Sequence, residues 1–366
     1  MTALAAASLP ISFRHLHHLS DDVGLFEHAE LTVPRRAHGY CLDDVARAFI
    51  VTVRQPDHTV ELGALASTYL NFVLDAQGAS GKFRNRRGVD GSWSDEPTVE
   101  DCWGRALWAL GTGIARAPEV DDARVAHAFS AGAALRSPWP RSMAFAGLGA
   151  AEVLTVRPRD EVAKSLLADA ATLIAGPDPL LGMTETIVAG WPWPESRLTY
   201  ANAALAETLV AAGSLLGVWK WLTAGLRMLS WLLDTETAGG HLSVSPAGGW
   251  GLGEPRPQFD QQPIEVAALA DACARAYDVT ADPRWSDAVS RCSAWFEGAN
   301  DSRTSLHDPV SGGGCDGLEP GGRNENQGAE STIAMISTFQ QAQRLGVASG
   351  PGFPPAFASS SAAAAP

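Results

Sequence analysis

The sequence predicts a mainly helical, all-α protein built from a repeated helical hairpin. Six segments begin with a polar or acidic cluster and continue into an apolar helical pattern rich in small residues. Each interval between successive segments has room for a second helix and its loops, and strand signals are sparse. Because a repeated supersecondary unit determines the architecture of a whole chain, these observations favour one large domain of paired helices.

The helices of the hairpins follow from their apolar spacing and from the residues at their starts. The apolar residues recur at helical intervals, and Asp or Pro often occupies the first turn of the second helices. The first helices are predicted at residues 42–53, 100–113, 141–156, 200–216, 261–277 and 327–345. The second helices are predicted at residues 62–77, 121–136, 160–174, 221–235 and 283–296. A short strand is expected within residues 241–245.

The two ends of the chain differ from the repeats. Residues 1–19 are expected to be an N-terminal extension, in which His15, His17 and His18 form a surface cluster. These histidines lack an acidic or thiol partner at a recognisable spacing, which argues against a metal site. Residues 347–366 consist mostly of small residues and proline and have no periodic apolar face, so a disordered tail is expected.

The composition excludes several classes of protein. Hydrophobic residues make up 46% of the chain and charged residues 19%, as in compact globular proteins. The net charge of −14 has the wrong sign for nucleic acid or an anionic membrane surface, so neither partner is expected. The most apolar helical stretch lies between Glu207 and Lys220 and is too short to span a bilayer.

The five cysteines predict neither a disulfide framework nor a zinc module, because they are odd in number and form no Cys-x-x-Cys pair. Reduced thiols and a start without a basic leader favour a cytoplasmic protein. No motif requires a metal or an organic cofactor. Asp308 and Asp316 could bind a calcium ion, but their spacing matches no known calcium loop, so a turn without a bound ion is favoured.

Two of the six hairpin starts match at residue level. Asp43 is followed four positions later by Arg47, and Asp101 by Arg105. Four positions are about one helical turn, so each pair can form on one helix face. The simpler interpretation is a first-turn carboxylate favoured by the helix dipole. That interpretation explains less well why the acids are doubled, as Asp43 with Asp44 and Glu100 with Asp101.

The resemblance to a known family rests on four runs. These are HGYCLDDVAR (38–47), EDCWGRALWALG (100–111), FDQQPIE (259–265) and NQGAEST (326–332). With the six hairpins, they resemble the six-hairpin glycosidase superfamily, the (α/α)6 toroid, and within it a bacterial branch labelled glycosyltransferase-like or glycosyltransferase-associated. The resemblance implies one toroid over residues 20–346. It also implies that the inner-helix starts converge on one end, where enzymes of this superfamily bind saccharides.

Catalysis at such an end is expected from carboxyl groups, because glycosidic bond cleavage usually uses two of them. Glu330 is the favoured acid or base, since it starts a helix behind a glycine-rich loop; a capping role is the alternative. Asp101 and Asp44 are the predicted partners. Arg105 and Arg47 are predicted to keep them ionised, because an adjacent cation lowers the pKa of a carboxyl.

Substrate contacts are predicted from amides and tryptophans. Gln261 and Gln262 can donate to and accept from sugar hydroxyls, while Glu265 either faces the opening or bonds between helices. Trp191 and Trp193 are the predicted sugar-stacking platform, with packing within the loop as an equal alternative. The other residues predicted to contact substrate are Asp43, Arg47, Glu100, Trp103, Arg105, Trp250, Asp260, Asn326 and Gln327. The tryptophans predicted to lie in the core are Trp219, Trp221, Trp231, Trp285 and Trp295.

The leading hypothesis is a glycoside hydrolase that acts on a neutral oligosaccharide or glycan by carboxylate acid/base catalysis. A sugar epimerase or isomerase is the second, with His38, His241 or His307 as the acid/base group. The third is a non-catalytic glycan-binding module associated with a glycosyltransferase. Glycosyl transfer by this chain is disfavoured because no glycine-rich nucleotide-binding motif is recognised.

Overall fold

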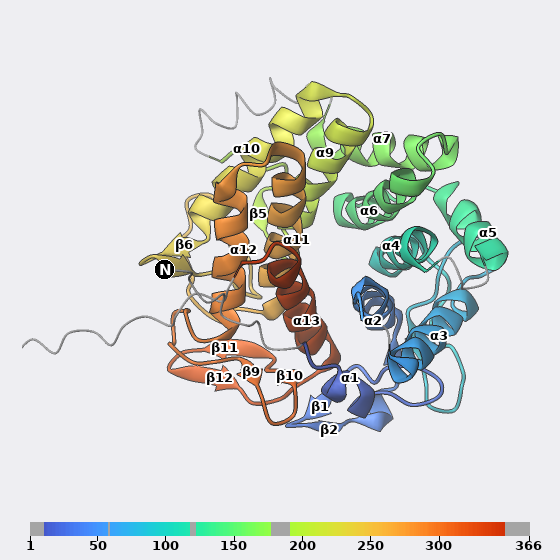
Figure 1. Cartoon of the computed structure of the whole chain (residues 1–366), viewed down its shortest axis with the longest axis horizontal. Coiled ribbons are helices and arrows are strands. Elements are labelled where there is room, and N and C mark those ends of the chain that lie inside the picture. Colours follow the sequence, from blue (N-terminus) through green and yellow to red (C-terminus); the bar gives the residue numbers. More distant parts are fainter. Residues whose placement is uncertain (1–10, 58, 118–121, 177–190, 348–366) are drawn as a thin grey trace, which may run out of the picture.

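Six helices form a closed inner ring in the computed structural model, which describes residues 11–57, 59–117, 122–176 and 191–347. Each inner helix packs against the next, and the last packs against the first (Figure 1). These helices are α2 (Leu42–Arg54), α4 (Asp101–Arg116), α6 (Pro140–Val156), α9 (Ala203–Leu215), α11 (Pro263–Thr280) and α13 (Ala329–Arg344). The chain therefore has the predicted mainly helical, (α/α)6 toroid architecture.

A second layer of helices surrounds the ring. Its long members each pack on the inner helix that precedes them. They are α3 (Val60–Asp75), α5 (Asp122–Ala133), α7 (Glu161–Ala175), α10 (Trp219–Thr235) and α12 (Pro283–Phe296). The hairpin helices predicted from the sequence agree with the observed ones within a few residues at each end.

The short helix α1 (Arg14–His18) packs against α13 and completes the outer layer there. Leu16 and Leu19 are fully buried. His15 is also buried, and its Nε2 lies 2.8 Å from the carbonyl oxygen of Gln327. The prediction of surface histidines is thus wrong for His15, which packs with α1 against α13, whereas His17 and His18 are exposed as predicted.

The inner helices α4 and α6 approach each other so closely that glycine is required between them. A Cβ atom on Gly111 would lie 2.1 Å from the carbonyl oxygen of Gly149, and one on Gly149 would lie 2.3 Å from that of Leu107. At the start of the same two helices, a Cβ on Gly104 would lie 2.3 Å from the carbonyl oxygen of Ser142. The contact therefore sets the first turn of α4 directly beside that of α6.

Short antiparallel strand pairs lie in the connections of the toroid. They are β1 (Ala29–Glu30) with β2 (Val33–Pro34), β3 (Tyr40–Cys41) with β4 (Arg86–Arg87), β5 (Arg197–Leu198) with β8 (Trp250–Gly251), β6 (Thr237–Ala238) with β7 (His241–Leu242), β9 (His307–Asp308) with β10 (Gly313–Gly314), and β11 (Gly317–Glu319) with β12 (Gly322–Asn324). Strand β7 falls within the predicted strand segment. Strand β3 runs directly into α2, so this pairing fixes the loop that begins the first inner helix.

The core tryptophans follow the prediction in part. Trp285 and Trp295 are buried, whereas Trp221 and Trp231 are half-buried against the core. Trp219 is 62% exposed, so its assignment to the core is wrong; it is the first residue of the outer helix α10 and faces solvent. All five cysteines are buried and unpaired. In the described part of the chain, no helix is both long and apolar enough to cross a membrane.

Candidate active site

A cavity of about 380 Å³ opens where α4 and α6 begin. Its walls come from the first turns of α2, α4 and α6, from the segment before α4, and from the loop before α9. We call this space the mouth cavity. Its lining consists of Asp43, Asn85, Asp95, Thr98, Glu100, Asp101, Cys102, Trp139, Pro140, Arg141, Ser142, Glu195 and Tyr200.

Asp43 contributes a carboxyl group with one free oxygen to the mouth cavity. Its Oδ2 accepts a 3.4 Å hydrogen bond from Asn85 Nδ2, whereas its Oδ1 is buried and has no partner. Burial raises the pKa of Asp43 above its ordinary value, and the positive charges of Arg105 and Arg47 oppose that rise. Such a carboxyl group is suited to hold a proton and deliver it to a bound ligand.

Asp101, the first residue of α4, is held by two hydroxyl groups. Its Oδ1 accepts from Ser142 Oγ at 2.6 Å, and its Oδ2 accepts from the Tyr200 hydroxyl at 2.5 Å. Burial and the charge of Asp101 raise the pKa of Tyr200 well above its ordinary value, so the phenol stays a donor. The close contact of α4 with α6 thus produces an oriented carboxylate that can act as a base or a nucleophile.

Arg47 joins the starts of the first and last inner helices. Its guanidinium Nη2 donates to Asp44 Oδ1 at 2.5 Å and to Glu330 Oε2 at 2.9 Å. Its Nε donates to the Asp43 carbonyl oxygen at 3.2 Å, which fixes the first turn of α2. Arg47 therefore contacts Asp44 as expected, and its charge acts to lower the pKa of that carboxyl. Burial raises the pKa of Asp44 to about 7, because the loss of hydration outweighs the attraction of Arg47.

Glu330 and Asp44 therefore share a contact with Arg47 but differ in solvent exposure. The Glu330 side chain is 38% exposed and the Asp44 side chain 5%, and Arg47 lies between them. Neither carboxyl lines the mouth cavity, whereas Asp101 does. Their catalytic roles stay predictions. The geometry gives both an additional role, since they hold the arginine that braces Asp43.

Arg105 does not pair with Asp101 as the four-residue spacing predicted. Its guanidinium carbon lies 3.6 Å from the centre of the Phe145 ring. Burial, with repulsion from Arg47, lowers the pKa of Arg105 to about 10. Arg105 and Arg47 line the top of a smaller axial cavity of about 40 Å³ with a largely apolar wall. The aromatic contact has replaced the expected ion pair, because the side chain runs toward α6.

The predicted sugar-stacking platform is occupied by protein. Trp191 and Trp193 are only 6% and 3% exposed. Both rings contact Trp231 of the outer helix α10, and Trp191 also contacts Trp250 edge to face. The indole of Trp191 donates to the Glu195 carbonyl oxygen at 2.8 Å. The stacking prediction is wrong for this loop, because the rings form an aromatic cluster that holds the loop on α10.

Other predicted substrate contacts are internal as well. Trp103 is fully buried and donates to the Gly132 carbonyl oxygen at 3.1 Å. Gln261 is fully buried between Asp301 and Trp295, with which it makes hydrogen bonds. The amide of Gln261, which was expected to meet sugar hydroxyls, thus meets the protein instead.

The segment around Glu265 connects hairpins. Glu265 accepts from the Asn202 amide nitrogen at 2.9 Å and from the backbone of residues 201 and 202, so the inter-helix alternative holds. Burial raises the pKa of Glu265 to about 8. Asp260 is exposed and Gln262 precedes α11, but neither lines the mouth cavity.

The glycine-rich loop before α13 is likewise held internally. Asn326 Oδ1 accepts from the Leu31 backbone nitrogen at 2.9 Å. Gln327 is buried and donates to Asp308 Oδ2 at 2.9 Å. Glu100, by contrast, is exposed and lines the mouth cavity, and its role as a contact residue stays a prediction.

Two aromatic residues of the mouth cavity were missed from the sequence. The side chain of Trp139 is 58% exposed and that of Tyr200 is 42% exposed. Trp139 is the residue before α6, and Tyr200 lies three positions before α9. Inspection of the residues just before each inner helix would have found both, since these positions converge at the mouth.

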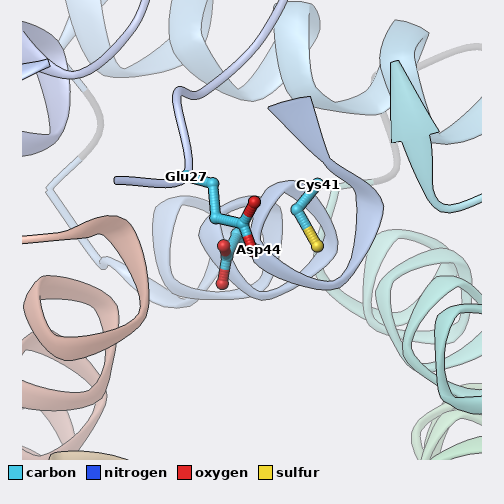
Figure 2. Close-up of side chains that lie close together, drawn as sticks. All are labelled: Glu27, Cys41 and Asp44. Atoms are coloured by element: carbon cyan, nitrogen blue, oxygen red, sulfur yellow. The ribbon is translucent and has the colours of Figure 1, made fainter. Parts of the chain in front are cut away.

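Three side chains that could ligate a metal lie beside the first turn of α2. Glu27, Cys41 and Asp44 point toward one another, with potential ligand atoms within 4.8 Å (Figure 2). Glu27 is already ion-paired with Arg86, and Asp44 with Arg47. Burial raises the pKa of the Cys41 thiol well above its ordinary value, which disfavours the thiolate that a metal needs. These contacts fit a structural role better than a metal centre.

The fold was compared with known proteins. No family model matches the sequence, and no curated protein matches it either. Solved structures do match. A sugar epimerase from a ruminal bacterium superposes with a TM-score of 0.69 at 10% identity, covering 93% of this chain and 97% of the epimerase.

Hydrolases have the same fold. An alpha-mannanase of Bacteroides thetaiotaomicron matches with a TM-score of 0.62 at 10% identity, covering 90% of this chain and 94% of the mannanase. A cellulase of C. cellulolyticium, solved with cellobiose, matches with a TM-score of 0.57 at 9% identity, covering 88% of each chain.

These similarities define the class to which the fold belongs. The chain has the (α/α)6 toroid fold that these solved structures of sugar hydrolases and a sugar epimerase share. Identities near 10% establish the fold alone, so the activity has to be argued from the site. The narrower resemblance to a glycosyltransferase-like bacterial branch stays a prediction.

Proposed function

We propose that the protein is a glycoside hydrolase whose catalytic carboxyl groups are Asp43 and Asp101. The observation that carries this proposal is their different surroundings in one cavity. Burial raises the pKa of Asp43, whereas two hydroxyl donors orient Asp101. Enzymes usually assign the acid and base roles to two carboxyl groups by placing them in environments that separate their pKa values.

The roles follow from those environments. Asp43 donates its proton to the glycosidic oxygen as the bond to the leaving sugar breaks. Asp101 either activates a water molecule or attacks the anomeric carbon, and Tyr200 and Ser142 keep its oxygens aimed at that position. Arg47, held by Asp44 and Glu330, supports the first turn of α2 and so positions Asp43.

An epimerase is the second candidate, favoured by the similar folds of sugar epimerases. Proton transfer at neutral pH in such an enzyme is readily performed by histidine. Among the described residues, neither the mouth cavity nor the axial cavity has a histidine in its wall. His241 and His307 are paired with Asp301 and Glu297 instead. The carboxyl groups therefore favour hydrolysis.

The test begins with a mass-spectrometric screen of the full chain against an oligosaccharide library. Hydrolysis adds one water to the products, whereas epimerisation leaves the mass unchanged and changes the sugar identity. On the substrate found, Asp43→Asn and Asp101→Asn should each lower kcat by about 10²- to 10⁴-fold.

Asp169→Asn is the matched control, because this acid lies on the outer helix α7 and pairs with Arg136 there. It should retain full activity. Unchanged turnover in folded Asp43→Asn and Asp101→Asn proteins would remove these residues from catalysis. Products of unchanged mass would replace the hydrolase with an epimerase.

A further inference from the structure

The wall of the axial cavity contains an arginine without a hydrogen-bond acceptor. Arg105 is 6% exposed and lies in this wall. Its guanidinium carbon is 3.6 Å from the centre of the Phe145 ring and 5.9 Å from that of the Trp108 ring, and both rings belong to the same wall. Among the described residues, none accepts a hydrogen bond from this guanidinium, and no carboxylate lies within ion-pair distance of it.

The other charged side chains of this wall are paired. Arg54 contacts Asp271 at 3.1 Å, and Glu207 contacts Arg275 at 2.8 Å. Arg47 has two carboxylate partners. In the part of the chain that the structure describes, the unpartnered arginine is therefore the one wall charge without a counter-ion.

The nearby acids do not supply that counter-ion. Asp43, Asp101 and Glu330 attract Arg105 from beyond contact distance. Asp101 and Glu330 bind other groups, and burial favours the protonated form of Asp43. Burial and repulsion from Arg47 lower the pKa of Arg105 to about 10, so the guanidinium is still charged at neutral pH.

A buried guanidinium without an acceptor costs folding free energy, because it has lost its hydration and gained no hydrogen bond in return. Such donors in a cavity wall indicate an acceptor that comes from outside the protein. A water molecule would accept a hydrogen bond but would bring no negative charge. An anion would supply both.

The size and the wall of the cavity favour one kind of anion. A volume of about 40 Å³ holds about three water-sized groups, which is enough for a carboxylate with a short carbon chain and too little for a sugar ring. A guanidinium binds a carboxylate through two parallel hydrogen bonds. Apolar wall residues such as Ile264 and Ile333 suit the attached carbon atoms. A phosphate dianion would need a second free cation, and the other wall arginines are paired.

We infer that the axial cavity is a carboxylate-binding subsite, in which Arg105 binds the anionic group and the apolar wall surrounds its carbon atoms. The group comes either from a free short-chain acid or from a carboxyl substituent on a sugar in the mouth cavity. The second source is within reach because Arg105 lies one helical turn after Asp101, which lines the mouth cavity. The inference goes beyond the proposed hydrolysis, which requires no anion.

The experiment compares carboxylates with their uncharged amides on the full chain. Acetate, propionate and the methyl glycosides of glucuronic and galacturonic acid are each titrated beside the corresponding amide, by calorimetry or by ligand-observed NMR. At least one carboxylate should bind about tenfold more tightly than its amide, because the hydrogen bonds to the guanidinium become charge-assisted. At saturation it should also raise the midpoint of thermal unfolding. Preference among the free acids or among the sugar acids identifies the source.

Arg105→Met then locates the subsite. It should abolish the preference, while the midpoint of thermal unfolding without ligand stays the same or rises, because a buried charge without an acceptor is removed. An arginine with a purely structural role would lower that midpoint when replaced. Arg344→Met is the matched control, since this arginine pairs with Asp278 at the last residue of α13, and it should leave the preference unchanged.

Three results would overturn the inference. They are equal binding of every carboxylate and its amide, binding of chloride as tight as that of the best carboxylate, and a preference that survives in folded Arg105→Met. The first two need no variant, so the test holds even if Arg105→Met does not fold. Bond cleavage is scored separately in the oligosaccharide screen, and failure of either proposal leaves the other standing.

Discussion

The two ends of the toroid contain similar numbers of charged residues but use them differently. At the opposite end of the ring, where the inner helices finish, a cavity of about 560 Å³ is lined by four arginines and four carboxylates. They are Arg54, Arg116, Arg275, Arg344, Glu152, Glu207, Asp271 and Asp278. The mouth cavity has five carboxylates and one arginine.

At this rear end the charges are paired with one another. Arg275 contacts Glu207 at 2.8 Å and Glu152 at 3.6 Å, and Arg54 contacts Asp271 at 3.1 Å. The rear cavity has as many cationic as anionic side chains in its wall, whereas the wall of the mouth cavity has more carboxyl groups than cations. The contrast teaches that pairing, rather than the presence of charge, distinguishes a structural network from a binding site.

The largest expected effects are a loss of kcat from a change at the mouth cavity and a loss of stability from a change at the rear cavity. Asp101→Asn at the mouth should lower kcat by about 10²- to 10⁴-fold while the midpoint of thermal unfolding changes little. The reason is that the amide keeps the contact with Ser142 but loses the negative charge. Activity assays on the screened substrate and calorimetric melting check it. A loss of stability without a loss of kcat would erase the contrast between the two ends.

Arg275→Met in the rear cavity should instead lower stability and leave turnover unchanged. It leaves Glu207 and Glu152 buried without their shared cation, so the free energy of unfolding should fall by about 3–5 kcal/mol. Turnover per folded molecule should stay the same. Urea titration measures the first quantity. Arg344→Met, in an exposed pair with Asp278, is the control and should cost at most about 1 kcal/mol.

A smaller effect is expected from pH. The pKa of Glu265 is raised to about 8 from an ordinary 4.5 by burial. Between these values the folded state binds more protons than the unfolded state, so the free energy of unfolding should decrease as pH rises through this window. Urea titrations at several pH values test this. Glu265→Gln should reduce the slope, and an undiminished slope would assign the effect to the other buried acids whose pKa values are raised to about 7, namely Asp44, Glu207 and Glu236.

The smallest effect concerns the rim of the mouth. Trp139→Ala should raise the Kd of the best disaccharide about fivefold, since one exposed aromatic contact contributes about 1 kcal/mol. The midpoint of thermal unfolding should hardly change. Trp219→Ala is the matched control, because that ring is 62% exposed on the outer helix α10. Equal effects of the two changes would show that exposure alone, and not the place at the mouth, explains the binding loss.

The fold was predictable because its signal is local and repeated. Each hairpin helix has its own apolar spacing, and markers such as Asp101 and Arg141 lie at helix starts. The site was less predictable, because partners come from different hairpins. The ion pair of Arg47 with Glu330 joins residues 283 positions apart, and no spacing along the chain encodes it.

The tryptophans illustrate the same limit. A loop with Trp191 and Trp193 has the same composition whether its rings face a ligand or face Trp231 of another hairpin. Trp139 was missed although it has the clearer position, directly before an inner helix. A residue lines the mouth cavity because of its position in the toroid, and the local composition of its loop does not determine this.

Closure of the ring also affects when the mouth can assemble during synthesis. Helix α2 is made early, but its neighbour α13 and the Glu330 contact come from the far part of the chain, as does the His15 contact with Gln327, 312 positions away. N-terminal segments generally fold first on the ribosome, and contacts so distant in sequence form late. A nascent chain that lacks α13 therefore has an Arg47 without its Glu330 contact, and the support of the first turn of α2 is complete only when the ring closes.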